Sequence, residues 1–172
     1  MAIRGVLAAA ALALAGCQSV PSDAPRATAS LQPTKGNQTS GTVTFVQVGD
    51  RVRVTAVVTG LKPGREHGFH VHEVGDCSSG DGMSTKGHFN PHGKPHAHYS
   101  SMDRHAGDMP VLKADANGRA EENFDLDVIT VAPGPASVVG RGLIVHADPD
   151  DYKTQPTGNA GARVACAVIR RG

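Results

Sequence analysis

The chain carries nine histidines, and eight of them lie between His67 and His105. Within this stretch His70 and His72 alternate with Phe69 and Val71, so on a strand both imidazoles would project from one face. Imidazole nitrogen is a ligand for zinc, copper, iron and nickel, and a set of four imidazoles favours copper. The pattern therefore predicts a bound transition metal.

Further nitrogen and oxygen donors follow in two places. The segment from Gly87 to Asp108 is rich in glycine and proline, which predicts a loop, and it contains no cysteine. The apolar run at residues 143–145 is typical of a buried strand, whose end could bring a distant imidazole back to the cluster. The candidate ligands in these two places are His88, His92, His96, His98, His105, Asp108 and His146.

The first residues are typical of an exported protein. Arg4 precedes an apolar run, residues 5–16, that is too short to span a bilayer and indicates a secretory signal. It ends in Leu-Ala-Gly-Cys, which resembles a bacterial lipobox. We therefore expect residues 1–17 to be a lipoprotein-type signal peptide, with Cys17 as a lipid anchor on the periplasmic face of the cell envelope. An ordinary signal peptide with an incidental cysteine is the alternative, and the choice between inner and outer membrane stays open.

Residues 18–38 are rich in proline, serine, threonine and alanine and have almost no large apolar side chain, which predicts a flexible tether. The chain has 17 basic and 16 acidic residues, and Arg4 is the one charged residue of the signal, so the mature chain has zero formal net charge. Nothing in this balance favours nucleic acid. At this length we expect one folded domain, over residues 39–172.

Two cysteines remain once Cys17 is assigned to the anchor. In an oxidising compartment Cys77 and Cys166 are expected to form a disulfide, which would stabilise the fold by roughly 4 to 5 kcal/mol in the chain-entropy model. Free or metal-ligating cysteines are the alternative.

The elements that must position these residues are strands. Short runs with period-2 character recur between turn residues, at 42–48, 51–58, 119–128, 142–146 and 163–169. No part of the mature chain shows a sustained apolar stripe at helical spacing. The pattern predicts an all-β fold, an antiparallel Greek-key sandwich or barrel, with a core of small aliphatic side chains because tryptophan is absent. Residues 73–110 are expected to be mostly a functional loop.

Five blocks of sequence are similar to those of one known family. HGFHVHE, GHFNP, RHAGD, GRGLIVH and GNAGARVAC occur in this order, and together they resemble the copper,zinc superoxide dismutases over residues 39–169. The cofactors implied by the resemblance are copper and zinc. The lipobox and the long loop before His88 place the chain nearer the bacterial, exported members.

The resemblance also implies roles for individual residues. It makes His88 a bridge between the two metals and Arg163 the arginine that guides the substrate. Asp150 is implied to link a copper histidine to a zinc histidine, and His67 to be an orienting hydrogen-bond partner. The implied copper ligands are His70, His72, His88 and His146, and the implied zinc ligands are His88, His96, His105 and Asp108.

Two histidines are left over, and we expect both to be solvated. His92 has no assigned role. His98 is an alternative zinc ligand, because some relatives vary the length of this loop. His96 is preferred because it lies eight residues after His88 and nine before His105, as in the common family pattern.

The resemblance implies an enzyme that dismutates superoxide to dioxygen and hydrogen peroxide, with copper as the redox metal and zinc as a structural ion. His88 would act in turn as ligand and acid. A non-enzymatic periplasmic buffer or carrier for copper or zinc is the alternative, and it would need neither a metal bridge nor a guiding arginine. A homodimer and a monomer both stay open.

Overall fold

The computed structural model describes residues 21–172, so the predicted signal peptide and Cys17 lie outside the described residues. The strands are β1 (Arg26–Pro33), β2 (Ser40–Val48), β3 (Arg51–Thr59), β4 (Glu66–His67), β5 (Phe69–His72), β6 (Leu112–Lys113), β7 (Ala120–Leu126), β8 (Gly142–His146), β9 (Arg163–Val168) and β10 (Arg170–Arg171). Within residues 21–172 the only helix is a 3₁₀ turn, η1 (Met83–Thr85). The all-β prediction is confirmed.

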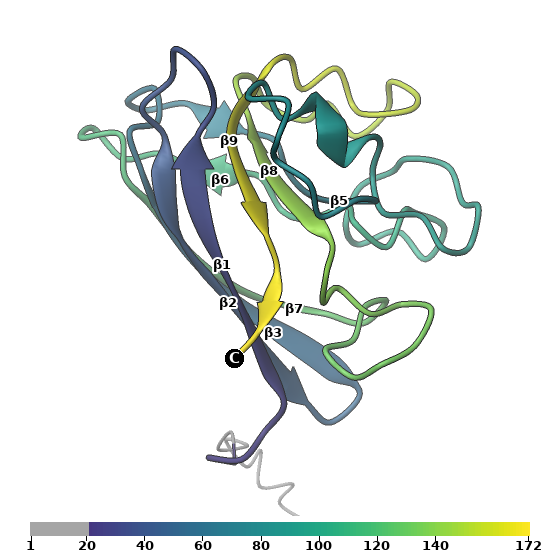
Figure 1. The fold of residues 1–172 in the computed structure, drawn as a ribbon. Coiled ribbons are helices and arrows are strands. Elements are labelled where there is room, and N and C mark those ends of the chain that lie inside the picture. Colours follow the sequence, from purple (N-terminus) through teal and green to yellow (C-terminus); the bar gives the residue numbers. More distant parts are fainter. Residues whose placement is uncertain (1–20) are drawn as a thin grey trace, which may run out of the picture.

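The strands form one curled antiparallel sheet with long loops gathered beside β5 (Figure 1). Its order is β5-β8-β9-β1-β2-β3-β7, with β10 also paired to β1, and β4 and β6 form a separate pair. β1, β2 and β3 follow one another as neighbours, while β9 returns by a long connection to lie beside β1. This is the Greek-key arrangement that the sequence predicted.

The predicted strand ranges agree with the observed ones to within two residues. β3 shows why: Val52, Val54, Ala56 and Val58 are buried while the residues between them face outward. The apolar side chains of such strands build the core, whose largest fully buried members are Phe45, Phe69, Leu31, Met109, Leu112, Leu126, Leu143, Ile144 and Ile169. No helix within residues 21–172 is long and apolar enough to cross a membrane.

The prediction of a tether over residues 18–38 is wrong where the structure describes the chain. β1 occupies residues 26–33 of this range and pairs with β2 along most of its length and with β9 at Gln32 and Pro33. Ala27, Ala29 and Leu31 alternate along it and are almost completely buried. Two of these side chains are alanines, so the strand carries little hydrophobicity and resembles a linker in composition. The folded domain therefore begins before residue 39.

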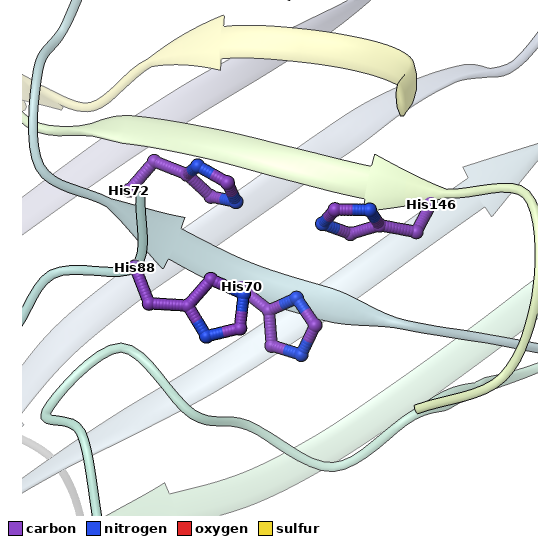
Figure 2. A group of neighbouring side chains, drawn as sticks. All are labelled: His70, His72, His88 and His146. Atoms are coloured by element: carbon purple, nitrogen blue, oxygen red, sulfur yellow. The ribbon is translucent and has the colours of Figure 1, made fainter. Parts of the chain in front are cut away.

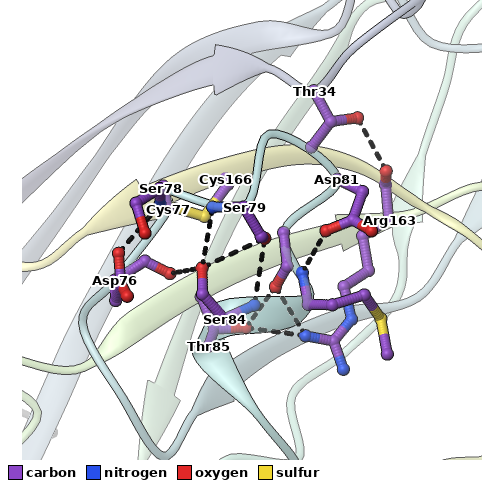
Figure 3. Close-up of a disulfide and its surroundings, with 12 residues drawn as sticks. Thr34, Asp76, Cys77, Ser78, Ser79, Asp81, Ser84, Thr85, Arg163 and Cys166 are labelled. Atoms are coloured by element: carbon purple, nitrogen blue, oxygen red, sulfur yellow. Dashed lines mark hydrogen bonds between the residues drawn. A yellow bond between two sulfur atoms is a disulfide. The ribbon is translucent and has the colours of Figure 1, made fainter.

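The predicted disulfide is confirmed. Cys77 in the loop after β5 is bonded to Cys166 in β9, across a sequence separation of 89 residues (Figure 3). It ties the loop that carries η1 to the sheet. The long loop itself is also as predicted, because η1 is its only regular element between β5 and β6.

Candidate metal centre

Three histidines of the first metal group come from two paired strands. His70 and His72 alternate along β5, and His146 ends β8, the antiparallel partner of β5. The N–H of His146 donates to the carbonyl of Gly68 (2.8 Å), which puts the ring of His146 on the same face of the sheet as the other two. Phe69 and Val71, on the opposite face, pack into the core. The alternation predicted from the sequence is therefore what aims the imidazoles together.

His88 joins these three residues from the loop. The loop runs along the free edge of β5, where the N–H of Phe89 donates to the carbonyl of Val71 (2.8 Å) and the N–H of Glu73 donates to Gly87 (2.9 Å). All four rings are buried and converge on one point (Figure 2). The candidate ligand atoms of His70, His72, His88 and His146 lie within 4.8 Å of one another.

In each of these rings one nitrogen is hydrogen-bonded and the other is not. The bonded pairs are His70 Nε2 with Asp150 Oδ2 (2.8 Å), His72 Nδ1 with the Lys86 carbonyl (2.8 Å), His88 Nδ1 with Asp108 Oδ1 (2.9 Å) and His146 Nδ1 with the Gly161 carbonyl (3.2 Å). The other nitrogens, His70 Nδ1 and the Nε2 atoms of the remaining three, are buried without a partner among residues 21–172. Buried polar atoms without partners are costly, and four of them facing one another fit a cation that accepts their lone pairs.

The electrostatics of this group keep its lone pairs available. Burial, reinforced by the neighbouring imidazoles, lowers the pKa of His72 and His146 well below the ordinary value. The same causes lower the pKa of His88 to about 3, although Asp108 opposes them. At neutral pH these rings are therefore unprotonated at the nitrogen that faces the group, as a metal ligand must be.

A second group shares His88 with the first. It consists of His88, His96, His105 and Asp108, all buried, with candidate ligand atoms within 4.8 Å of one another. Asp108 Oδ1 lies 2.9 Å from His88 Nδ1, 3.0 Å from His96 Nδ1 and 3.4 Å from His105 Nδ1. Its other oxygen accepts from the N–H groups of His105 and Ala97 (both 3.1 Å), which fixes the carboxylate. Three nitrogens and one oxygen would supply all four ligands of a structural zinc ion.

The carboxylate of Asp150 connects the two groups. It is buried and lies 2.8 Å from His70 Nε2 and 2.9 Å from His96 Nε2, one oxygen to each ring. Each bond fixes which nitrogen of its ring is left to face a metal. Burial would lower the pKa of His96, but Asp108 and Asp150 outweigh it and raise that pKa to about 9. Burial likewise would raise the pKa of Asp150, but hydrogen bonds from His70 and His96 hold it well below the ordinary range.

Arg163, at the start of β9, is held by the loop that contains η1 (Figure 3). Its guanidinium donates to the carbonyl of Gly82 (2.7 Å), the hydroxyl of Thr85 (2.8 Å) and the carbonyl of Lys86 (2.6 Å). The Lys86 carbonyl also accepts from His72, so a single oxygen separates the guanidinium from the first metal group. Burial lowers the pKa of Arg163 and Asp81 opposes this shift.

The other three histidines lie in the environments that the sequence analysis predicted, one buried and two exposed. His67 is buried, and its Nδ1 lies 2.8 Å from the carbonyl of His146, so it fixes the backbone of that residue rather than a ring. His92 and His98 are exposed, and His98 Nδ1 is bonded to Ser100 (2.8 Å). The structure brings His96, and not His98, into the second group.

This geometry agrees with the comparison to known proteins. A profile described as "Copper/zinc superoxide dismutase (SODC)" matches residues 39–169. The chain belongs to the copper/zinc superoxide dismutase family. It is 44% identical over 135 residues to "Superoxide dismutase [Cu-Zn]" of Paramecium bursaria Chlorella virus 1, which covers 75% of this chain and 71% of that one. Among solved structures it is similar to the "clock protein EA4", with a TM-score of 0.77 and 41% identity over 91% of this chain and 99% of that chain.

Membership in the copper/zinc superoxide dismutase family makes the chain an oxidoreductase acting on superoxide, with copper and zinc as cofactors. The two metal groups fit that pair of ions. The first is all imidazole, a donor set suited to copper, and the second is the mixed closed set suited to zinc. The alternative of a non-enzymatic buffer does not account for a relative of this identity that is named for the activity.

Two positioning residues were not predicted. The side-chain amide of Gln155 clamps the main chain of His96, accepting from its N–H (2.9 Å) and donating to its carbonyl (2.7 Å). Gly158 has φ +68°, and a Cβ there would overlap Asp150 Oδ1. Gly158 could have been noted as a turn glycine, but nothing in the sequence marks Gln155.

Proposed function

We propose that the chain dismutates superoxide at a centre that holds copper and zinc side by side. The proposed copper ligands are His70, His72, His88 and His146, and the proposed zinc ligands are His88, His96, His105 and Asp108. The observation that carries this assignment is His88, which belongs to both groups: its Nδ1 lies 2.9 Å from Asp108 of the second group, and its buried Nε2 has no partner among residues 21–172. One ring facing both sets supports a shared bridge.

The residues give this centre its chemistry. Copper, when bound, supplies the one-electron redox change, since zinc has no accessible one. His88 Nε2 would take up a proton when that nitrogen is free and give it to the departing peroxide, which takes its second proton from water. Meanwhile, the contact of His88 Nδ1 with the second group holds the ring of His88 in place. The low pKa of His88 does not oppose this step, because a ring with one proton is neutral.

Arg163 is proposed to guide the substrate. Superoxide is a small anion, and a mature chain without net charge cannot attract it as a whole, so a local cation must do so. Three hydrogen bonds fix the guanidinium beside the loop carbonyl that also orients His72. Asp150 and His67 act through the ligands they orient and are positioning residues.

Metal loading tests the proposal. Superoxide consumption is measured on the same purified protein loaded with copper and zinc, and with zinc alone. Near-diffusion-limited turnover that needs copper supports the proposal, whereas tight binding of both metals without turnover would favour a buffer. His146→Ala is expected to lower copper content and spare zinc, and His105→Ala to do the reverse. A variant that loses both metals equally would argue against two separable sets.

We also propose that the protein works at the periplasmic face of the cell envelope, anchored through a lipid on Cys17. The proposal rests on the lipobox-like Leu-Ala-Gly-Cys at the end of the apolar run. Cys17→Ser is expected to release the protein from the membrane fraction and to abolish fatty-acid labelling while activity persists. Continued membrane association of that variant would contradict the anchor.

A further inference from the structure

A hollow lies away from the metal centre, at the β7 edge of the sheet and on its core side, because Glu122 and Phe124 share a face of β7 with the buried Ala120 and Leu126. It has a volume of about 350 Å³, within the range of small-molecule sites, and it shares no side chain with either metal group. Its lining residues come from β7, from the pair β4 and β6, from the loop between β5 and β6, and from the loop between β8 and β9. The proposed function does not use it. We call it the aromatic hollow.

Aromatic rings form one side of the aromatic hollow. His98 packs against Tyr99 and against Tyr152, with ring centroids 4.2 and 4.5 Å apart, and Phe124 of β7 lines the hollow as well. Tyr99, Tyr152 and Phe124 are only partly buried, so parts of their rings remain open to solvent. The hydroxyl of Tyr152 accepts from the N–H of Val111 (3.1 Å), which fixes that ring in place. The faces of aromatic rings carry a negative quadrupole that attracts cations.

The charged side chains that line the hollow include more acidic than basic residues. Glu66 and Glu122 both line the hollow, and Lys113 is the one cation among its lining residues. The ammonium of Lys113 lies 3.9 Å from Glu66 with both side chains exposed, so this pair is weak and solvent-screened. Glu122 accepts only the backbone N–H of Lys113 (3.3 Å). Burial raises the pKa of Tyr152 to about 12, and the charges of Asp150 and Glu66 add to that shift.

We propose that the aromatic hollow binds a small organic ammonium ion, of which trimethylammonium compounds are the best fit. Aromatic faces attract such cations strongly because their charge is spread over apolar methyl groups that need little hydration. Carboxylates on the rim select the cation over a neutral molecule of the same shape. Metal cations are a poorer fit, because the residues of the hollow form no group with converging ligand atoms within residues 21–172.

Calorimetric titration of choline chloride into the copper- and zinc-loaded protein tests the proposal. The comparison ligand is the uncharged analogue in which a tert-butyl group replaces the trimethylammonium group, at constant ionic strength. We expect choline to bind and the analogue not to bind. Tyr99→Leu is expected to weaken choline binding about 2- to 30-fold, the range that one cation–π contact covers.

Variants that change the charge of the rim are a second test, because they should change the affinity for choline in opposite directions. Glu122→Gln keeps the oxygen that accepts from the backbone of Lys113, removes one negative charge, and should weaken binding; Lys113→Gln should strengthen it. Glu121→Gln is the matched control, because Glu121 is the adjacent residue of β7 and pairs with Arg119 outside the hollow. None of these variants should change the dismutation rate.

The trimethylammonium group occurs both in soluble compounds and in lipid headgroups. Co-sedimentation with phosphatidylcholine vesicles, compared with phosphatidylglycerol vesicles, distinguishes these two sources. Binding to phosphatidylcholine vesicles that Tyr99→Leu weakens would assign the headgroup, and binding to choline alone would assign the free compound. Absence of choline binding, equal binding of the uncharged analogue, or identical affinities for the Tyr99→Leu variant and the parent would overturn the proposal.

Discussion

The amide of Gln155 should control zinc affinity without touching the metal. It makes two hydrogen bonds to the main chain of His96, a member of the second group. Each such bond contributes about 0.5 to 1.5 kcal/mol, and because Gln155 is exposed, water replaces part of what is lost. Gln155→Met, which keeps the side-chain length, should therefore cost about 1 to 2 kcal/mol, or about 5- to 30-fold in zinc affinity.

The assay is competition for zinc against a chelator of known affinity, with copper affinity measured in parallel. Copper binding should change little, because His96 is not in the first group. Gln32→Met is the matched control, since Gln32 is an exposed glutamine of β1 whose side chain bonds only to Ser30. Zinc affinity of Gln155→Met within twofold of that of the control would refute the idea that the clamp positions His96.

Three further outcomes are expected. Arg163→Ala should lower the second-order rate with superoxide about tenfold or more at low ionic strength while both metals stay bound; lost copper would contradict a guiding role. Replacing Cys77 and Cys166 by serine should lower the free energy of unfolding in urea by about 4 to 5 kcal/mol, and a loss under about 1 kcal/mol would contradict that estimate. Zinc affinity of the metal-free protein should rise about tenfold per pH unit up to about pH 9. The reason is that His96 has its pKa raised from 6.5 to about 9 and must lose a proton before zinc binds; a flat profile in chelator competition would contradict it.

The strands that carry the first metal group could be predicted because local pattern and tertiary role coincide in them. In β5 the alternation of Phe69 and Val71 with His70 and His72 is both a strand signal and the division between core and metal face. β1 was missed for the opposite reason. Its buried positions are two alanines and one leucine, and its place in the sheet depends in part on β9, which lies far along the chain.

The metal-binding loop could be predicted in its residues but not in its geometry. The family resemblance favoured His96 over His98, as the structure shows, but it could not indicate which ring nitrogen faces a metal. That choice depends on the atom bonded to the other nitrogen, such as a carboxylate oxygen of Asp150 or the carbonyl of Lys86. Backbone carbonyls are the same in every residue, so no sequence pattern marks the one that orients His72.

The two metal groups differ in what holds them before any metal arrives. Three of the four residues in the first group lie on adjacent, paired strands, so the ladder between β5 and β8 fixes their separation. All four residues of the second group lie in the loop, where backbone bridges to β5 hold His88 and Asp108 but not His96 or His105. The positions of these two rings depend on single contacts, namely the Asp108 and Asp150 carboxylates and the Gln155 clamp. Because His88 belongs to both groups, order that zinc imposes on the loop also places the fourth nitrogen of the first group. Zinc binding should therefore raise copper affinity, and by reciprocity copper should raise zinc affinity by the same factor.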